Sequence, residues 1–342
     1  MQLMVKWLVL FSLIFSLHTA TAQQTNTLVF YNVENLFDTW DDPLTADEEF
    51  SPQGTKHWTS VRLTKKLQML YKAIIAASEG QFPCIIGLAE VENRWVVEQL
   101  IAQTPLRKIH YGIIHKDSPD SRGIDVALLY RKDIIKPIDF DFIPVGKIGK
   151  NGFQSRDILY LKAKLSDKQF HLYVNHWPSR SGGYTETVAK RELAATILRS
   201  QVNALLLDDP NTRIVIMGDF NAAPSEKCIS TILKAIPYPG DDNLNSLVNL
   251  STLWGKSADG TIRNGGQWEI FDQIICTKNL LTDPLIQVQS GVKGICNYNF
   301  LLEADKTYLG SKPFRTYMGP TYHGGTSDHL PVKIQVKSFP LK

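Results

Sequence analysis

Short apolar runs that end in polar or ionisable residues are the feature of this sequence that most constrains its fold. Residues 214–217 are entirely apolar and are followed by Gly218 and Asp219. A run this short and this apolar is consistent with a strand buried on both faces. Polar residues also stand in or beside other apolar runs, namely Asn32 with Glu34, Glu90, Asn175 with His176, Asp272, and Asp328 with His329. Because a rigid scaffold positions functional groups at its strand ends, we expect these side chains to meet in one cleft.

The order of the expected elements indicates one α/β domain. Apolar periodicity predicts helices over residues 61–78, 94–102 and 187–207. Strands are predicted over residues 27–33, 84–89, 108–114, 124–131, 158–165, 169–175, 214–217, 268–276 and 330–336. The alternation of polar and apolar residues over 160–165 indicates antiparallel sheet with one face in water. We therefore expect two packed mixed β-sheets flanked by helices.

Three long segments, residues 38–59, 147–157 and 290–325, fit no regular element. Loops of this length in a compact domain are uncommon unless they carry function. The sequence contains no internal repeat, and no Pro-, Gly- or Ser-rich linker divides it. We therefore expect residues 23–342 to form a single domain.

Residues 1–22 have the composition of an export signal. Lys6 precedes an apolar run over residues 7–17, and Ala20, Thr21 and Ala22 provide the small-residue pattern that signal peptidases cleave. The run is shorter than the roughly 20 residues that span a membrane, although an uncleaved N-terminal anchor remains the alternative. We expect the mature chain to be secreted or periplasmic, to have no membrane span and to be a monomer.

The net charge argues against a strong non-specific nucleic-acid binder, and the cysteine spacing argues against a cysteine-based zinc site. The net charge is +3, and removal of Lys6 with the signal leaves +2, which is not the charge of a strong non-specific nucleic-acid binder. The four cysteines form no CxxC pair, so a cysteine-based zinc site is excluded. Cys84 and Cys276 lie at apolar strands and are expected to be buried thiols, whereas the disulfide status of Cys228 and Cys296 stays open.

Taken singly, the polar residues have plain structural explanations. Asp219 and Asn221 fit an Asx-type turn, and a lone histidine such as His176 is commonly a packing residue. Asp272 is harder to explain, because a carboxylate on a mostly apolar strand is costly to bury unless it is paired. Together the residues have the chemistry of phosphoester hydrolysis. Carboxylate and amide oxygens suit a hard cation such as Mg²⁺, imidazoles and amides bind phosphate oxygens, and an Asp can orient or deprotonate water.

Six motifs that contain these residues resemble those of the endonuclease/exonuclease/phosphatase superfamily, whose fold is deoxyribonuclease I-like. They are YNVENLF, GLAEVEN, VNHWPSR, MGDFNAAP, FDQII and TSDHLP, in this order along the chain. The sequence is most similar to exported bacterial members described as predicted extracellular nucleases. The resemblance implies a four-layered α/β sandwich and metal-assisted, in-line attack of water on a phosphoester.

The resemblance also implies roles for individual residues. Glu90 would be the principal metal ligand, helped by Asn32 and by Asp328, with Mg²⁺ as the expected ion and Mn²⁺ or Ca²⁺ as alternatives. Asp219 would position or activate the water, and Asp272 would pair with His329. Asn221, His176 and His329 would hold the phosphate. Glu34 stands where only some relatives carry an acidic residue, so its role is left open.

The sequence departs from the family pattern at two places, and the second of these bears on the class of substrate. Ala89 precedes Glu90 where many nucleases of the family carry Gln. Inositol-polyphosphate 5-phosphatases carry a Trp-Cys-Asp-Arg sequence where this chain has Phe271, Asp272 and Gln273, which disfavours a phosphoinositide substrate.

Aromatic and basic residues in the long loops are candidates for substrate binding. We predict Arg180, Arg315 and Tyr317 as substrate contacts, because such side chains stack on bases and bind phosphates. The alternative for the aromatic residues is that they pin the long loops to the domain. An acidic run between Asp41 and Glu49 matches no known calcium loop and is read as solvated.

Three functions remain in consideration. The first is a secreted phosphodiesterase, a nuclease acting on DNA or RNA. The second is a phosphomonoesterase or a lipid or inositol headgroup phosphoesterase, which the near-neutral net charge favours. The third is a binding protein that has lost catalysis on the same scaffold, and it is disfavoured because every expected catalytic position is filled.

Overall fold

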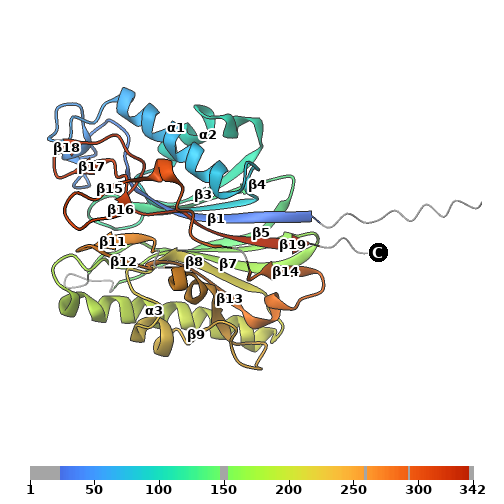
Figure 1. The fold of residues 1–342 in the computed structure, drawn as a ribbon. Coiled ribbons are helices and arrows are strands. Elements are labelled where there is room, and N and C mark those ends of the chain that lie inside the picture. Colours follow the sequence, from blue (N-terminus) through green and yellow to red (C-terminus); the bar gives the residue numbers. More distant parts are fainter. Residues whose placement is uncertain (1–23, 147–152, 258–259, 292, 339–342) are drawn as a thin grey trace, which may run out of the picture.

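Two β-sheets packed face to face form the centre of the protein, with helices covering both outer faces (Figure 1). The computed structural model describes residues 24–146, 153–257, 260–291 and 293–338. Helices α1 (Ser60–Ala77) and α2 (Arg94–Ala102) cover one sheet, and α3 (Tyr184–Asp208) covers the other. The predicted α/β sandwich is therefore confirmed. The predicted export signal, residues 1–22, and residues 147–152 of one predicted loop lie outside the described residues.

The first sheet is mixed and holds both ends of the described chain. Its six strands follow the order β14, β19, β1, β2, β4, β3. Their bounds are β14 (Ile286–Gln289), β19 (Val332–Ser338), β1 (Gln24–Leu36), β2 (Ile85–Val91), β4 (Asp125–Arg131) and β3 (Tyr111–His115). Strand β1 runs parallel to β2 and antiparallel to β19. The polar residues that end β1 and β2 therefore share one edge.

The second sheet is also mixed, and its seven strands follow the order β5, β6, β7, β8, β13, β10, β9. Their bounds are β5 (Ile135–Ile143), β6 (Ile158–Leu165), β7 (Lys168–His176), β8 (Ile214–Asp219), β13 (Asp272–Thr277), β10 (Leu247–Asn249) and β9 (Ala235–Pro237). Strands β5, β6 and β7 form an antiparallel meander, as predicted for residues 158–175. Strand β7 is parallel to β8, and β13 is antiparallel to β8.

Apolar side chains from both sheets fill the space between them in one continuous core. Gly87 on β2 lies at a close contact between the sheets, because a Cβ there would stand 2.9 Å from Met217 Sδ. A second cluster packs β7 and β8 against α3. Burial of apolar surface contributes about 25 cal/mol per Å² to folding, so these two clusters are the main source of stability.

Helices α1 and α2 begin within one residue of their predicted starts, whereas α3 begins at Tyr184, three residues before its predicted start. Thr59 caps α1 by accepting a hydrogen bond from Arg62 N, and Asn93 caps α2 by accepting one from Val96 N at 3.1 Å. The buried side of α1 contains Leu63, Leu67 and Leu70 at helical spacing. No helix among the described residues is long and apolar enough to cross a membrane. All four cysteines are buried free thiols.

Strands β5, β14, β10 and β9 of the two large sheets were not predicted, and neither were several short elements outside these sheets. The expected strand over residues 268–276 is two strands in different sheets, β12 (Gln267–Glu269) and β13, separated by Ile270 and Phe271. The expected loop 290–325 contains two small hairpins, formed by β15 (Leu302–Ala304) with β16 (Ser311–Pro313) and by β17 (Tyr317–Met318) with β18 (Thr321–Tyr322). Strand β11 (Ile262–Asn264) pairs with β12. The remaining helical turns are η1 (Glu48–Phe50), η2 (Pro105–Lys108), η3 (Cys228–Ile232), η4 (Leu250–Ser257), η5 (Lys278–Leu281) and η6 (Asn299–Leu301).

Candidate active site

Three of the candidate residues stand side by side at one edge of the second sheet. The parallel register of β7 and β8 pairs His176 with Asp219. The antiparallel register of β8 and β13 pairs the same Asp219 with Asp272. One row across three strands therefore presents an imidazole and two carboxylates, and all three side chains are buried.

Asn32 of the first sheet connects this row to Glu90. Its Nδ2 donates to Asp219 Oδ2 at 3.0 Å and to Glu90 Oε1 at 3.3 Å. Its Oδ1 accepts the backbone N–H of Glu34 at 3.0 Å, which fixes the orientation of the amide. Asn32 thus presents its donor to the two carboxylates, and its Oδ1, which can accept a second contact, is the atom that a metal-ligand role would use.

Three site residues have left-handed backbone conformations. Glu34, Glu90 and Asn221 have φ values of 50°, 63° and 48°. Such conformations cost about 1 kcal/mol or more for residues other than glycine and concentrate at functional sites. In this chain they occur near the ends of β1, β2 and β8, where the candidate residues lie.

His329 is held by two carboxylates. Its Nδ1 hydrogen-bonds Asp272 Oδ2 at 2.7 Å, and its Nε2 lies 3.7 Å from Asp219 Oδ2. Thr261 Oγ1 accepts the backbone N–H of Asp272 at 3.1 Å and helps to fix that carboxylate. Burial opposes the charged imidazolium, but Asp272 and Asp219 outweigh it and raise the pKa of His329 well above its usual value. The two carboxylates therefore favour the protonated form of the ring.

His176 has the opposite electrostatic character. Its Nε2 lies 3.8 Å from both Glu90 Oε1 and Asp219 Oδ2, and its Nδ1 is buried without a hydrogen-bond partner among the described residues. Burial, together with the positive charges of Arg156 and Arg122, lowers the pKa of His176 well below its usual value. One neutral and one charged imidazole thus flank the same carboxylate.

Asp219 is the central group of the site. Its Oδ2 is close to Asn32, His176 and His329, and its Oδ1 accepts the backbone N–H of Asn221 at 2.9 Å. Burial raises the pKa of Asp219 to about 6, although His329 opposes the shift. A carboxylate with this pKa is ionised at neutral pH and basic enough to take a proton from water.

A second acidic group lies beside Glu90. Arg315 donates from Nε to Glu34 Oε1 and from Nη2 to Asp328 Oδ2, each at 3.0 Å. Glu90 Oε2 accepts the N–H of Asn35 at 2.9 Å. The buried Lys66 ammonium donates to Glu34 O and to Thr316 Oγ1.

This acidic group fits a divalent cation. Burial and repulsion from Asp328 raise the pKa of Glu34 to about 7 in spite of Lys66 and Arg315. Negative charge is thus crowded around Glu34, Glu90 and Asp328, and oxygen ligands of this kind suit Mg²⁺ or Mn²⁺. Asp219, Asp272 and His329 also approach within metal-binding distance of one another. Glu34, Glu90 and Asp328 are not among the groups of described residues with this spacing. However, Asp272 and His329 already hydrogen-bond each other, so the chemistry of the oxygen ligands favours the Glu90 group.

Asn221 and Arg180 hold the segment that follows His176. Asn221 Nδ2 donates to Trp177 O at 3.1 Å. Arg180 donates to Asn221 O at 3.1 Å, and its guanidinium also pairs with Glu226 at 2.6 Å and Glu269 at 3.0 Å. The guanidinium of Arg180 is therefore satisfied within the protein.

The other two predicted substrate contacts have different surroundings. Tyr317 is buried against Phe50 and Trp58, and its hydroxyl donates to Lys56 O at 2.9 Å. Tyr317 thus pins loop 38–59 to the domain. Arg315 is the predicted substrate contact that is most accessible to solvent, because its side chain is 40% exposed. It borders two cavities, one of about 220 Å³ that also contains Arg263 and Lys312 and one of about 70 Å³ that also contains Lys56.

Sequence reasoning missed four residues that support the site: Lys66, Arg122, Arg156 and Ser327. Ser327 Oγ donates to Asn32 O at 2.7 Å and accepts the N–H of His329 at 3.0 Å. Arg156 Nη2 donates to Trp177 O at 2.8 Å. A signal existed only for Lys66, which interrupts the apolar stripe of α1 between Leu63 and Leu67.

Comparison with known protein families identifies the class of the chain. Residues 27–338 match the family model described as Endonuclease/Exonuclease/phosphatase family. The chain belongs to this family. Its members are metal-dependent hydrolases of phosphoester bonds, and the chain is an enzyme of this class. A search among curated protein sequences gave no match.

Solved structures agree on the fold. A family protein from Bacteroides thetaiotaomicron matches with a TM-score of 0.56 at 14% identity, over 94% of this chain and all of that one. The human Nocturnin catalytic domain matches with a TM-score of 0.54 at 16% identity, over 93% of this chain and 97% of that one. A mannosyl-6-phosphatase from Bacteroides thetaiotaomicron matches with a TM-score of 0.53 at 14% identity, over 91% of this chain and 99% of that one. At these identities the similarity shows the fold alone.

Proposed function

We propose that the chain is a secreted phosphodiesterase that acts on nucleic acid. The observation that carries the proposal is the convergence on Asp219 Oδ2 of the Asn32 amide at 3.0 Å and of two imidazoles at 3.7 and 3.8 Å. A carboxylate that can accept a proton lies among groups that can bind a phosphate. This combination is what in-line attack of water on a phosphoester requires.

Each residue has a part in the proposed reaction. Asp219 orients the attacking water and accepts its proton. The charged His329, held by Asp272, donates to a non-bridging phosphate oxygen and stabilises the negative charge that develops there. Neutral His176 and the amide of Asn221 are the other candidate contacts to the phosphate. Asn32 keeps Asp219 and Glu90 at a fixed separation.

The proposed cation is Mg²⁺, held by Glu90 with Asp328 and Glu34 beside it. When bound, a divalent cation polarises the phosphoryl group and offsets its developing charge. Arg315 is tied to both Glu34 and Asp328, so it limits the repulsion between these two carboxylates. The carboxylate of Glu90 is therefore the ligand on which binding of the cation depends most.

The surroundings of Arg315 favour a substrate with more than one phosphate. The two cavities that Arg315 borders bring Arg263, Lys312 and Lys56 close to the acidic group. Basic side chains beside a reaction centre suit a chain of phosphates, as in single-stranded nucleic acid. Arg315 is the main candidate, because Arg263, Lys312 and Lys56 also have partners within the protein.

Purified residues 23–342 provide the test. We expect Mg²⁺-dependent release of acid-soluble nucleotides from DNA or RNA, and its loss in His329→Ala. The exposed His110 is the matched control, and His110→Ala should retain activity. Undiminished release by His329→Ala, or by the wild type in excess chelator, would contradict the proposal.

A phosphomonoesterase or a lipid or inositol headgroup phosphoesterase is the second candidate. The small net charge of +3 favours it, because a strong nucleic-acid binder is usually more basic. Bis-p-nitrophenyl phosphate and p-nitrophenyl phosphate separate the two functions. Turnover of the monoester alone would replace the first proposal by the second.

Export and assembly are part of the proposal. The signal-like residues 1–22 support secretion or periplasmic localisation. We propose that the mature chain acts as a monomer. Sedimentation of residues 23–342 and N-terminal sequencing of the exported protein test these two points, with Gln23 as the expected first residue.

A further inference from the structure

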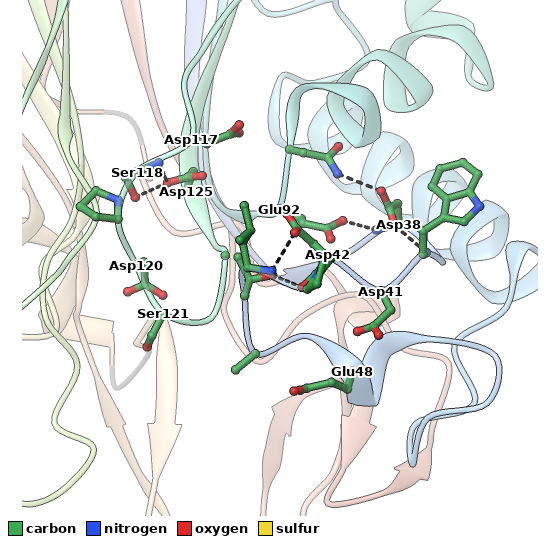
Figure 2. A pocket seen from close by; sticks show the side chains of 18 of the residues that line it. Asp38, Asp41, Asp42, Glu48, Glu92, Asp117, Ser118, Asp120, Ser121 and Asp125 are labelled. Carbon is green, nitrogen blue, oxygen red and sulfur yellow. Dashed lines mark hydrogen bonds between the residues drawn. The ribbon is translucent and has the colours of Figure 1, made fainter.

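A strongly acidic cavity lies apart from the residues proposed for catalysis. It has a volume of about 890 Å³ and separates part of loop 38–59 from the loop that joins β3 to β4 (Figure 2). Eight carboxylates line it: Asp38, Asp41, Asp42, Glu48, Glu92, Asp117, Asp120 and Asp125. Among the described residues that line it there is no lysine or arginine. Acidic clusters are common on protein surfaces, so this cavity alone identifies no ligand.

A buried histidine beside the cavity provides an independent observation. The side chain of His115 is only 2% exposed, and its Nε2 is buried without a hydrogen-bond partner in the described part of the chain. This nitrogen lies 3.9 Å from Asp125 Oδ2, and the other ring nitrogen lies 3.8 Å from Asp117 Oδ1. A buried polar atom without a partner is costly, so a ligand at this nitrogen would relieve a cost that the protein carries.

The carboxylate of Asp125 is oriented for such a ligand. Its Oδ1 accepts hydrogen bonds from the hydroxyl and from the backbone N–H of Ser118. The other oxygen, Oδ2, is the one that faces His115. Figure 2 shows Asp117, Ser118 and Asp125 together on one wall of the cavity. Hydrogen bonds that fix one carboxylate oxygen and leave the second for an ion are typical of metal sites.

We propose that His115, Asp117 and Asp125 form a second divalent-cation site, for an ion that accepts imidazole, such as Zn²⁺ or Mn²⁺. One ligand atom from each residue lies within 4.8 Å of the other two. Zn²⁺ and Mn²⁺ bind a mixture of imidazole and carboxylate, whereas Mg²⁺ and Ca²⁺ favour oxygen ligands alone. Water and the other cavity carboxylates complete the coordination.

The position of this site suggests what the cation does. His115 ends β3 and Asp125 begins β4, so an ion between them closes the base of loop 116–124. In this loop Asp120 pairs with Arg156 at 2.8 Å, and Arg156 donates to Trp177 O at 2.8 Å. The cation would therefore order the loop that holds Arg156 next to the segment after His176. This last step alone rests on the proposed function.

Calorimetric titration of metal-stripped protein with Zn²⁺ tests the site. The Glu90→Gln variant is the starting point, because it weakens cation binding at the proposed catalytic site. Binding of Zn²⁺ to the His115 site can then be measured separately. We expect His115→Gln in this background to lose one bound equivalent or to weaken its dissociation constant at least tenfold. His110→Gln, a change of an exposed histidine, should leave binding unchanged. Equal stoichiometry and affinity with and without His115, or binding of Ca²⁺ but not Zn²⁺, overturns the proposal.

Trypsin cleavage provides a second readout that is independent of phosphoester hydrolysis. Lys116 and Arg122 lie in the loop, so Zn²⁺ should slow cleavage there in Glu90→Gln and not in Glu90→Gln/His115→Gln. Asp117→Asn alters a side chain that is 81% exposed and should leave the fold intact, so it reports on the site even if His115→Gln unfolds. We expect it to reduce both Zn²⁺ binding and protection. Protection that is equal in all variants contradicts the proposal, whether or not the enzyme cleaves nucleic acid.

Discussion

The proposed chemistry depends on Asp219 more than on any other residue, because its carboxylate contacts groups from both sheets. We expect Asp219→Asn to lower kcat by about 10²- to 10⁴-fold, the usual contribution of a general base. KM should change little, since an amide at this position can still accept the N–H of Asn221. Hydrolysis of bis-p-nitrophenyl phosphate with Mg²⁺ measures both constants. Asp167→Asn, in an exposed turn, is the matched control, and an equal loss in that variant would point to a general effect of the substitution.

The pKa shifts at the site predict the pH dependence of the reaction. Asp219 acts as its carboxylate, so activity should rise with pH through about 6, the raised pKa of this group. His329 acts as its cation, so activity should fall only at a pH well above the usual pKa of histidine. Asp272→Asn removes the carboxylate that contributes most to the raised pKa of His329. The fall of activity at high pH should therefore occur at a lower pH in this variant. A pH profile of kcat/KM for both proteins measures the shift, and coincident alkaline limbs would show that Asp272 has no such role.

Single residues also show how far the sequence reveals the site. Its motifs contained every residue in the row His176, Asp219 and Asp272, because polar residues at strand ends are visible without a structure. The ion pairs of Arg180 could not be predicted from the sequence, since its partners Glu226 and Glu269 lie 46 and 89 residues further along the chain. Long-range ion pairs of this kind follow from tertiary packing and not from local sequence.

At the scale of elements, the site requires β7 and β8 to approach closely, and Gly218 permits this approach. A Cβ at Gly218 would stand 2.4 Å from Asn175 O and 2.6 Å from Asn175 Cβ. We expect Gly218→Ala to destabilise the protein by about 1 to 3 kcal/mol, the usual cost of overpacking. Urea unfolding measures the change, with Gly291→Ala as the control because nothing lies within 4 Å of the added Cβ. Equal unfolding midpoints for the two variants would exclude this account.

Elements with strong periodicity were predicted closely, and those defined by pairing were not. Helix α2 matches its predicted residues, 94–102, because an Asn cap and an apolar stripe mark it. Residues 268–276 form two strands because β12 pairs with β11 and β13 pairs with β8, and a change of partner leaves no pattern in the sequence. The small hairpins within 290–325 are too short to show alternation.

At the scale of the whole molecule, the sandwich brings distant segments together at one edge. Strands β1 and β2 deliver Asn32 and Glu90, while β7, β8 and β13 deliver the row centred on Asp219. The strands that carry the site residues were predicted in their order along the chain, whereas β5, β9, β10 and β14 of the same two sheets were not predicted. The arrangement of the loops around the acidic cavity was not, because it depends on contacts between segments about 75 residues apart, such as Asp42 and Asp117.

The acidic cavity predicts how the stability of the whole protein depends on pH. Burial raises the pKa of Glu92 from 4.5 to about 9, so the folded protein holds this proton more tightly than the unfolded chain. The stability that this proton provides is complete below pH 4.5 and is lost as pH rises toward 9. In chelator, Glu92→Gln should therefore be more stable than the wild type at pH 8, by about 1 to 3 kcal/mol, the usual cost of a buried uncompensated group.

The advantage of Glu92→Gln should shrink as the pH falls from 8 to 5, because the pH then approaches 4.5, the pKa of Glu92 in the unfolded wild type, and the cost of taking up a proton on folding decreases. A glutamine oxygen can still accept the N–H of Asp38, which Glu92 accepts at 2.6 Å, so the substitution changes charge more than shape. Urea unfolding at pH 5, 6.5 and 8 measures the trend, and Glu98→Gln on the surface of α2 is the control. If the difference between Glu92→Gln and the wild type were the same at all three pH values, the carboxyl of Glu92 would not be the group that titrates. Addition of Zn²⁺ at pH 8 should then stabilise the wild type, because a cation in the cavity offsets the remaining negative charge.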